Sequence, residues 1–318
     1  MVDRTPKEVV ILATKVDINN LKNTVPLIQE HLNPRRINIV ANESVKEEID
    51  RIEGAYFVNE NDVYPGLTFD VVKELIRSVG GPENRAGWYL QQFLKLGWSY
   101  KTSEQNYISI DSDTYILDDI KYINKEGKYL FTSKIERHEP YFKTIKTLFS
   151  GSVLFDTEYS FIAEQMVFDV KYVKEMIRRI EANCDLQGEK FYEKIIKCIS
   201  VEDMIAGFSE FETYGNYMKT FHKDEFETRQ LSTFRKCAEV LGPVWDADIC
   251  KWVSNSFQII SMEKNLVLGK RVVFFHWLTN QRIIRSRVSF YDICKLYNKT
   301  IKLSDFLNHR KTLIYEEL

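Results

Sequence analysis

Two carboxylates one residue apart follow an apolar, strand-like segment in YISIDSDTYILDD (residues 107–119). On an extended segment Asp111 and Asp113 would point to the same side, because strand side chains alternate between faces. Two like charges this close repel each other unless a cation lies between them. A divalent Mn²⁺ or Mg²⁺ ion that also holds nucleotide phosphates would fill that role. The alternative is a polar turn, where aspartate is common, and we interpret Asp118 and Asp119 downstream as a solvated turn.

A second pair of acidic residues stands in the aromatic-rich segment GFSEFETYGNYM (residues 207–218). Burial among aromatic rings raises the pKa of a carboxyl group, so that Glu210 or Glu212 could accept a proton from a hydroxyl group. We favour Glu212. The alternative is the first turn of a helix, with Ser209 as the capping residue and Glu212 three residues later. The two interpretations are compatible.

One histidine, His276, is the polar residue of the apolar run RVVFFHWL, which predicts a buried strand. A neutral imidazole is a good ligand for Mn²⁺, so His276 is a candidate metal ligand. The alternative is a histidine that is simply hydrogen-bonded in the core.

The elements that must position these residues alternate between strand and helix. The apolar runs EVVILATK, RINIVAN and GAYFVNEND predict three strands, and helical patterns separate them. This βαβαβ order predicts an open α/β sheet, with ligands beyond the carboxyl ends of its strands. No linker is visible. We therefore predict one domain over residues 1–318, with a nucleotide-binding half (1–120), an acceptor half (121–280) and a helical extension (281–318).

Composition excludes several classes of protein. The 44 Lys and Arg nearly balance the 46 Asp and Glu, which leaves no basic footprint for nucleic acid. The five cysteines form no C-x-x-C pair, which indicates reduced thiols and a cytoplasmic protein. No apolar run approaches the roughly 20 residues that a membrane-spanning helix needs.

Four segments in order resemble one enzyme class. RAGWYLQQFLKL, DSD, AEQMVFD and SEFETYGNY are similar to segments of GT-A-type nucleotide-sugar glycosyltransferases. They look most like a bacterial GT-A-like group of unassigned function linked with capsule or lipopolysaccharide synthesis. The resemblance covers roughly residues 8–280 and implies a mixed, mostly parallel sheet flanked by helices. The acidic motif departs from the usual adjacent Glu-Asp pair, since it is Glu-Phe-Glu here.

The resemblance also implies roles for individual residues. It assigns Asp113 to the metal, Asp111 to the ribose or a metal-bound water, and His276 to the remaining metal position. The positions expected to bind the donor, by topology or by spacing on one helix side, are Thr14, Lys15, Asn42, Arg85, Trp88 and Gln92. The residues expected to bind the acceptor are Glu164 and Gln165. An exposed helix face is the alternative for Arg85, Trp88 and Gln92, and a helix cap region is the alternative for Glu164 and Gln165.

The expected activity is metal-dependent transfer of a sugar, with UDP as the expected nucleotide, to a glycan or lipid-linked glycan, with inversion. Basic residues near the C-terminus could contact the inner face of the membrane, or they could be a solvated face or bind the diphosphate. A nucleotidyltransferase is a rival interpretation, but LATKVDINN after the first strand lacks the glycines of a phosphate loop. A non-catalytic module that binds sugar nucleotides is the other.

Overall fold

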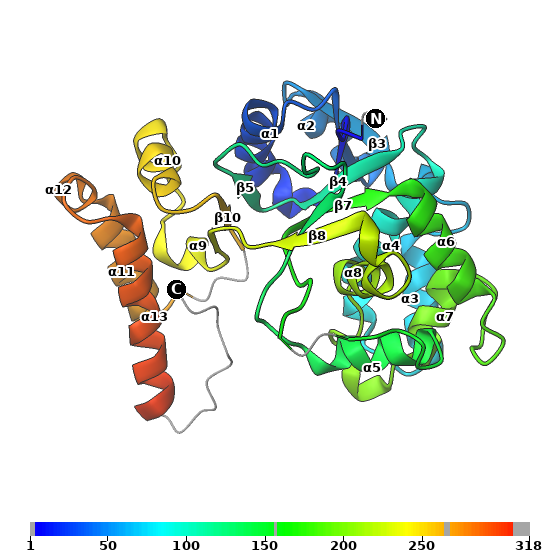
Figure 1. Cartoon of the computed structure of the whole chain (residues 1–318). Helices are drawn as coiled ribbons and strands as arrows, with labels where there is room; N and C mark the ends of the chain where they lie inside the picture. The colour runs from blue at the N-terminus through cyan, green and yellow to red at the C-terminus, as the bar shows by residue number, and fades with distance from the viewer. Residues whose placement is uncertain (1–3, 156–157, 264–267, 308–318) are drawn as a thin grey trace. The chain divides into compact units, whose positions relative to one another are not determined.

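A five-stranded sheet organises the larger part of the computed structural model, which describes residues 4–155, 158–263 and 268–307 (Figure 1). The strand order is β3-β2-β1-β4-β7. Four strands run parallel and the edge strand β7 runs antiparallel to β4. The strands are β1 (Glu8–Leu12), β2 (Arg36–Ala41), β3 (Ala55–Asn59), β4 (Asn106–Asp111) and β7 (Gln165–Asp169). The predicted α/β class with a mixed, mostly parallel sheet is confirmed.

Helices pack against this sheet, and their cover explains why its strands are apolar. Every residue of β1 is buried, as expected for a strand covered on both faces. The α-helices of this part are α2 (Lys46–Asp50), α3 (Phe69–Ser78), α4 (Ala86–Gly97), α5 (Glu139–Leu148), α6 (Val170–Glu181), α7 (Phe191–Cys198) and α8 (Glu210–Phe221). Side chains cap two of these helices: Thr68 accepts the Val71 N–H of α3, and Asp169 accepts the Lys171 N–H of α6. A short parallel pair, β6 (Tyr129–Thr132) and β8 (Phe226–Arg229), belongs to the same part.

The described chain divides into two compact units that interleave in sequence. Unit 1 holds the five-stranded sheet and comprises residues up to Ile18, Pro34–Ser112 and Lys121–Gln230. Unit 2 comprises Asn19–Asn33, Asp113–Ile120 and the chain from Leu231 onward. The chain passes from unit 1 to unit 2 within the turn after β4. One segment of unit 1 ends at Ser112, and a segment of unit 2 begins at Asp113.

Unit 2 has its own small sheet and its own core. Its sheet has the order β5-β10-β9. Its core packs aromatic and aliphatic side chains, among them Phe234, Phe257 and Phe290. Its elements are most of α1 (Ile18–Leu32), β5 (Thr114–Ile116), β9 (Thr233–Phe234), α9 (Cys237–Val240), α10 (Ala247–Ser254), β10 (Ile259–Ser261), α11 (Lys270–Asn280), α12 (Arg282–Arg285) and α13 (Phe290–Leu307).

The predicted strand around His276 is wrong, because RVVFFHWL lies within helix α11. Val272, Phe275 and Thr279 are buried at helical spacing, whereas the residues between them are mostly exposed or half-buried. A short apolar run does not separate a buried strand from a helix. Here the run is apolar on both sides because one side packs in the core and the other carries exposed Phe and Trp.

Candidate nucleotide-sugar site

A cavity of about 500 Å³ lies at the carboxyl edge of the five-stranded sheet. Its walls come from the ends of β1 and β2, the residues that follow β3, the first turn of α3 and one side of α4. This is the edge at which open α/β sheets bind ligands, since the loops after neighbouring parallel strands converge there. Three predicted donor-binding residues, Thr14, Lys15 and Asn42, line this cavity.

Local hydrogen bonds fix the loops that carry these residues. The Thr14 backbone N–H and hydroxyl both donate to Asp17 Oδ2, at 2.8 and 2.7 Å, which closes the turn after β1. Asn42 Oδ1 accepts the Ser44 N–H at 3.1 Å, and its amide donates to Glu60 Oε1 at 3.1 Å. These bonds close the turns after β1 and β2 and use the Thr14 and Ser44 N–H groups.

The face of α4 that lines the cavity differs from the predicted one. The cavity is lined by Gly87, Leu90, Gln91 and Leu94, and the predicted trio of Arg85, Trp88 and Gln92 does not belong to its wall. Arg85 lies over the Trp88 ring, 4.5 Å from its centroid. Gln92 is buried and accepts the Glu210 N–H at 3.3 Å. Successive helix residues are rotated by about 100°, so a shift of one position selects a different side of the helix.

Phe69 and Glu60 are among the lining residues that the sequence did not predict. Phe69, the first residue of α3, is 42% exposed and lines the cavity, which leaves one aromatic ring available to a ligand. Glu60 lines it beside Asn42. The sequence signal for Phe69 is its position one residue after the capping Thr68, where an aromatic side chain can remain outside the helical core face.

Asp111 lies at the same edge as the cavity. It ends β4 and pairs in register with Leu12, which ends β1 and lines the cavity. The carboxylate of Asp111 accepts a hydrogen bond from Lys95 Nζ at 2.6 Å, and Lys95 Nζ also contacts Glu210 Oε1 at 2.5 Å. Lys95 therefore joins the first aspartate of the D-x-D segment to the first glutamate of α8.

Burial and charge determine the ionisation of this network. The Lys95 side chain is 8% exposed and that of Glu210 is 4% exposed, whereas that of Asp111 is 40% exposed. Burial alone would lower the pKa of Lys95, but the carboxylates of Asp111 and Glu210 raise it above its ordinary value. Burial raises the pKa of Glu210, and the Lys95 ammonium opposes that shift. Lys95, which sequence reasoning missed, is the charged residue within the apolar face of α4.

Asp113 occupies a turn and not an extended strand. β4 ends at Asp111, and Ser112 and Asp113 form the turn that leads into β5. The strand alternation that predicted a common direction for the two carboxylates therefore does not apply to Asp113. Its carbonyl accepts the Met262 N–H at 2.8 Å, which ties the turn to the sheet of unit 2.

The two predicted acceptor residues lie beside Asp111. Gln165 begins β7 and pairs in register with Ile110, and the Glu164 carbonyl accepts the Asp111 N–H at 3.0 Å. Both side chains are buried. The Glu164 carboxylate lies 3.5 Å from Lys134 Nζ, and the Gln165 amide donates to Thr132 Oγ1 at 2.7 Å.

Glu212 points into the core of unit 1. Its carboxylate accepts the Phe161 N–H at 2.6 Å and the Asn216 amide at 2.7 Å, and the side chain is fully buried. Burial raises the pKa of Glu212 to about 7, and the two hydrogen bonds oppose that shift. Ser209 caps α8 by accepting the Glu212 N–H at 3.2 Å, as the helical interpretation predicted.

His276 belongs to unit 2, where its Nε2 lies 2.9 Å from the Ala238 carbonyl. Its imidazole is therefore held between α11 and α9. Within the described ranges, no group of three or more His, Cys, Asp or Glu side chains is placed to hold a metal ion.

Comparisons with known proteins give distant structural matches. The chain is similar to galactosyltransferase LgtC in complex with donor and acceptor sugar analogues, at 11% identity and a TM-score of 0.41, over 88% of this chain and 100% of that one. It is similar to mouse xyloside xylosyltransferase 1 in its apo form, at 11% identity and a TM-score of 0.38, over 83% and 100%. Core-mannan synthase A from Aspergillus fumigatus, in a Mn/GDP form, matches at 12% identity and a TM-score of 0.38, over 63% and 71%.

No family model and no curated protein matches the chain. In the part of the chain that is described, no helix has both the length and the apolar character needed to cross a membrane. Because the structural matches are this distant, the chemistry of the site has to be inferred from its own residues.

Proposed function

We propose that this protein transfers a sugar from a nucleotide-sugar donor to a glycan acceptor. The observation that carries the proposal is that Asp111, at the end of β4, lies at the same sheet edge as the 500 Å³ cavity. Asp111 pairs in register with Leu12, which lines that cavity. The cavity is lined by hydroxyl, amide, carboxylate and aromatic groups, which is the mixture that a nucleoside requires.

The donor's nucleoside would occupy the cavity. Phe69 offers a ring face for the base, and Glu60 and Asn42 offer acceptors and donors for ribose hydroxyls. Lys15, in the loop after β1, lines the cavity, and its ammonium would offset the negative charge of the donor phosphates. We retain UDP as the expected nucleotide.

The Asp111 carboxylate fits a role in binding a divalent cation. Its side chain is 40% exposed, and Lys95 bonds one of its two oxygens. We propose that Asp111 and Asp113, two residues apart in the chain, hold Mn²⁺ or Mg²⁺ together with the donor phosphates. When bound, the ion would stabilise the charge of the departing nucleoside diphosphate. Lys95 would hold the Asp111 carboxylate in place before the donor binds.

On the acceptor side, the contacts favour Glu210 over Glu212 as the residue linked to proton transfer. Glu210 shares Lys95 with Asp111, whereas Glu212 uses its carboxylate to hold Phe161 and Asn216 in the core. Glu164 and Gln165, next to Asp111 at the sheet edge, are the proposed acceptor contacts. A single displacement with this arrangement would invert the anomeric centre.

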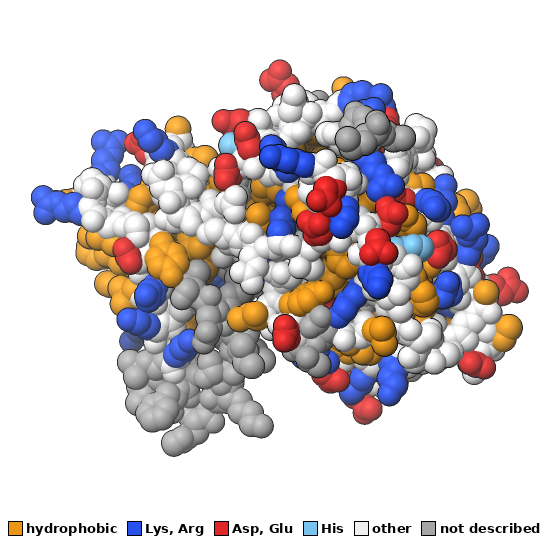
Figure 2. Space-filling view, in the orientation of Figure 1, with side chains coloured by type: hydrophobic (Ala, Val, Ile, Leu, Met, Phe, Trp, Pro, Cys, Tyr) orange, Lys and Arg blue, Asp and Glu red, His pale blue; other side chains and the backbone are white. Residues whose placement is uncertain are grey.

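A lipid-linked acceptor would suit the surface of unit 2. Figure 2 shows apolar and basic side chains side by side on its helical part. Phe274, Trp277 and Ile283 are about half exposed or more, and the basic residues in the same segment are Lys270, Arg271, Arg282, Arg285 and Arg287. Aromatic and basic side chains together favour the surface of an anionic membrane. We propose peripheral membrane contact here, in synthesis of a surface polysaccharide such as capsule or lipopolysaccharide.

The experiment that tests the function is a thermal-shift screen of UDP-, GDP- and CMP-sugars with and without Mn²⁺, followed by analysis of the released products. A ligand bound by the native state raises the melting temperature by mass action. A glycosyltransferase should be stabilised by one nucleotide-sugar and should release its nucleoside diphosphate when an acceptor or water takes the sugar. Release of pyrophosphate would assign a nucleotidyltransferase, and binding without any product would assign a non-catalytic module.

A further inference from the structure

A second cavity, of about 740 Å³, lies at the opposite edge of the five-stranded sheet. It is lined where β4 begins and β7 ends, by Ser103–Gln105 and Asp169–Tyr172, together with part of α6. The donor cavity lies beyond the other end of β4, a strand of six residues, or roughly 20 Å away at the usual rise. Among the described residues, none lines both cavities. The second cavity is therefore a separate feature of unit 1.

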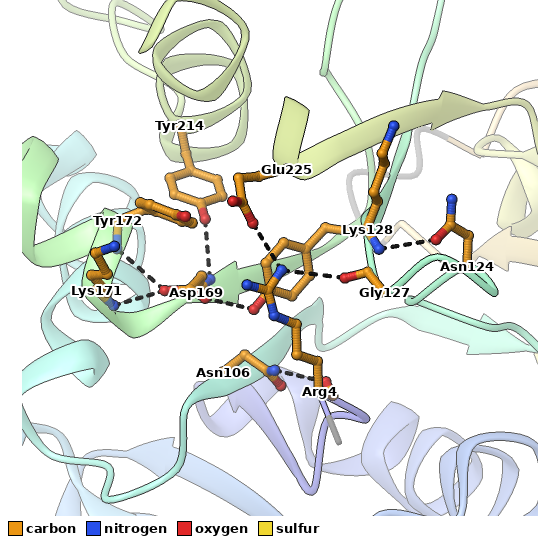
Figure 3. A network of polar contacts seen from close by, with 11 residues as sticks. Arg4, Asn106, Asn124, Gly127, Lys128, Asp169, Lys171, Tyr172, Tyr214 and Glu225 are labelled. Carbon is orange, nitrogen blue, oxygen red and sulfur yellow. Dashed lines mark hydrogen bonds and ion pairs between the residues drawn. The ribbon is translucent and has the colours of Figure 1, made fainter. Parts of the chain in front are cut away.

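A buried polar network gives this cavity a fixed wall (Figure 3). Asp169 accepts the N–H groups of Lys171 and Tyr172 at 2.9 and 3.3 Å and the Tyr129 hydroxyl at 2.5 Å. Arg4 donates to Glu225 at 2.8 Å, so its charge is already paired. The carboxylate in the cavity wall is thus used to cap α6 and does not present a free negative charge to a ligand.

Three cations on α6 line this cavity. Lys171, Lys174 and Arg178 are spaced i, i+3 and i+7, which places them on one side of the helix. Among the residues that the structure describes, none of the three has a carboxylate within ion-pair distance, whereas the cavity's Glu104 pairs with Arg35. The side of α6 that lines the cavity therefore has an excess of positive charge.

Aromatic rings accompany these cations. Tyr100 lines the cavity and is 41% exposed, and Lys174 Nζ lies 5.2 Å from the centroid of its ring. Along a helix, residues three or four apart advance by about 5 Å. The backbone positions that carry these cations therefore follow one another at about 5 Å along the helix axis, beside a ring on which a sugar could stack.

We propose that this cavity binds an acidic oligosaccharide, with its carboxylate or phosphate groups on Lys171, Lys174 and Arg178 and a sugar ring against Tyr100. Charge-assisted hydrogen bonds to these side chains would provide the affinity. A hollow fits a discrete chain better than the flat surface of a bilayer. A net charge of −2 for the whole chain disfavours long nucleic acids. The site is independent of the donor cavity and of the activity proposed for it.

The test is calorimetric titration of the full-length protein with a galacturonic acid hexamer, with neutral maltohexaose for comparison. The hexamer should bind, with an affinity that falls as salt is raised, and maltohexaose should bind much more weakly. The triple variant K171Q/K174Q/R178Q should lose at least about tenfold in affinity, because three exposed ionic contacts are removed.

A matched control removes the same charge elsewhere. Lys125, Lys197 and Lys251 are exposed and do not line this cavity, so K125Q/K197Q/K251Q should bind the hexamer like the parent protein. Equal loss in both triple variants, unchanged binding in the first, or no binding by the parent would overturn the proposal. Capture on phosphatidylglycerol vesicles that the first triple variant abolishes, without any binding of the hexamer, would assign the surface to a membrane instead.

Discussion

Replacing Lys95 by methionine tests whether the network at the end of β4 is ionised as described. The substitution removes the ammonium that lies between Asp111 and Glu210 and keeps a chain of similar length. Asp111 is exposed enough to be solvated, but Glu210 stays in the core with an unpaired charge. Removing one partner of a buried ion pair costs about 3–5 kcal/mol in the free energy of unfolding.

The pH dependence of that cost follows from Glu210. Without Lys95, burial raises the folded-state pKa of Glu210 further above its unfolded value, so stability should fall as the pH rises above the unfolded value. Keeping a glutamate protonated costs about 4 kcal/mol at pH 7.5 and about 1 kcal/mol at pH 5.0, from 1.36 kcal/mol per pH unit. We therefore expect K95M to be destabilised by about 3–4 kcal/mol at pH 7.5 and by roughly 3 kcal/mol less at pH 5.0.

Urea unfolding at both pH values measures this difference. K95M/E210Q also removes the buried carboxylate that Lys95 had paired, so the loss relative to the parent should be smaller and nearly independent of pH. A matched control is K46M, which breaks the exposed pair with Asp50 and should leave the free energy of unfolding nearly unchanged at both pH values. An equal loss at pH 5.0 and 7.5 in K95M, or a double variant no more stable than K95M at pH 7.5, would refute the buried-charge explanation.

Three further outcomes follow from other positions. Glu212 has a folded-state pKa of about 7, above its unfolded value, so it should reduce parental stability by about 3 kcal/mol as the pH rises from about 4.5 to above 7. E212Q should lack this decline in urea unfolding; parallel curves for both proteins would contradict it. In Gly215→Ala the new Cβ would overlap Phe161 Cγ, so the free energy of unfolding should fall by about 1–3 kcal/mol, whereas Gly87→Ala, on an open helix side, should be neutral or stabilising. Asp113→Ala should abolish release of nucleoside diphosphate while its melting temperature stays near that of the parent; full activity of this variant, or of the parent in EDTA, would count against the metal role.

Elements with a strong repeating pattern could be predicted from the sequence. The buried strands β1, β2 and β4, the amphipathic helices α3 and α6 and their caps are all visible as local patterns, because burial on a sheet or helix face imposes a period on the residues. The same patterns place Thr14, Lys15 and Asn42 at the ends of strands, and the cavity is found there. α11 was misassigned because a run that is apolar on both sides has no distinguishing period.

What the sequence by itself determined is the order of the elements and the edge of the sheet where ligands should bind. The tertiary structure alone decided which side chains meet there. Lys95 contacts Asp111 and Glu210 across 16 and 115 positions of the chain, and no local pattern encodes such a contact. The second cavity likewise joins the start of β4 to α6, through a network that includes Arg4 and Glu225. Such groupings of side chains form only when strands pair and helices pack. They are therefore visible in the folded structure and not in a local sequence pattern.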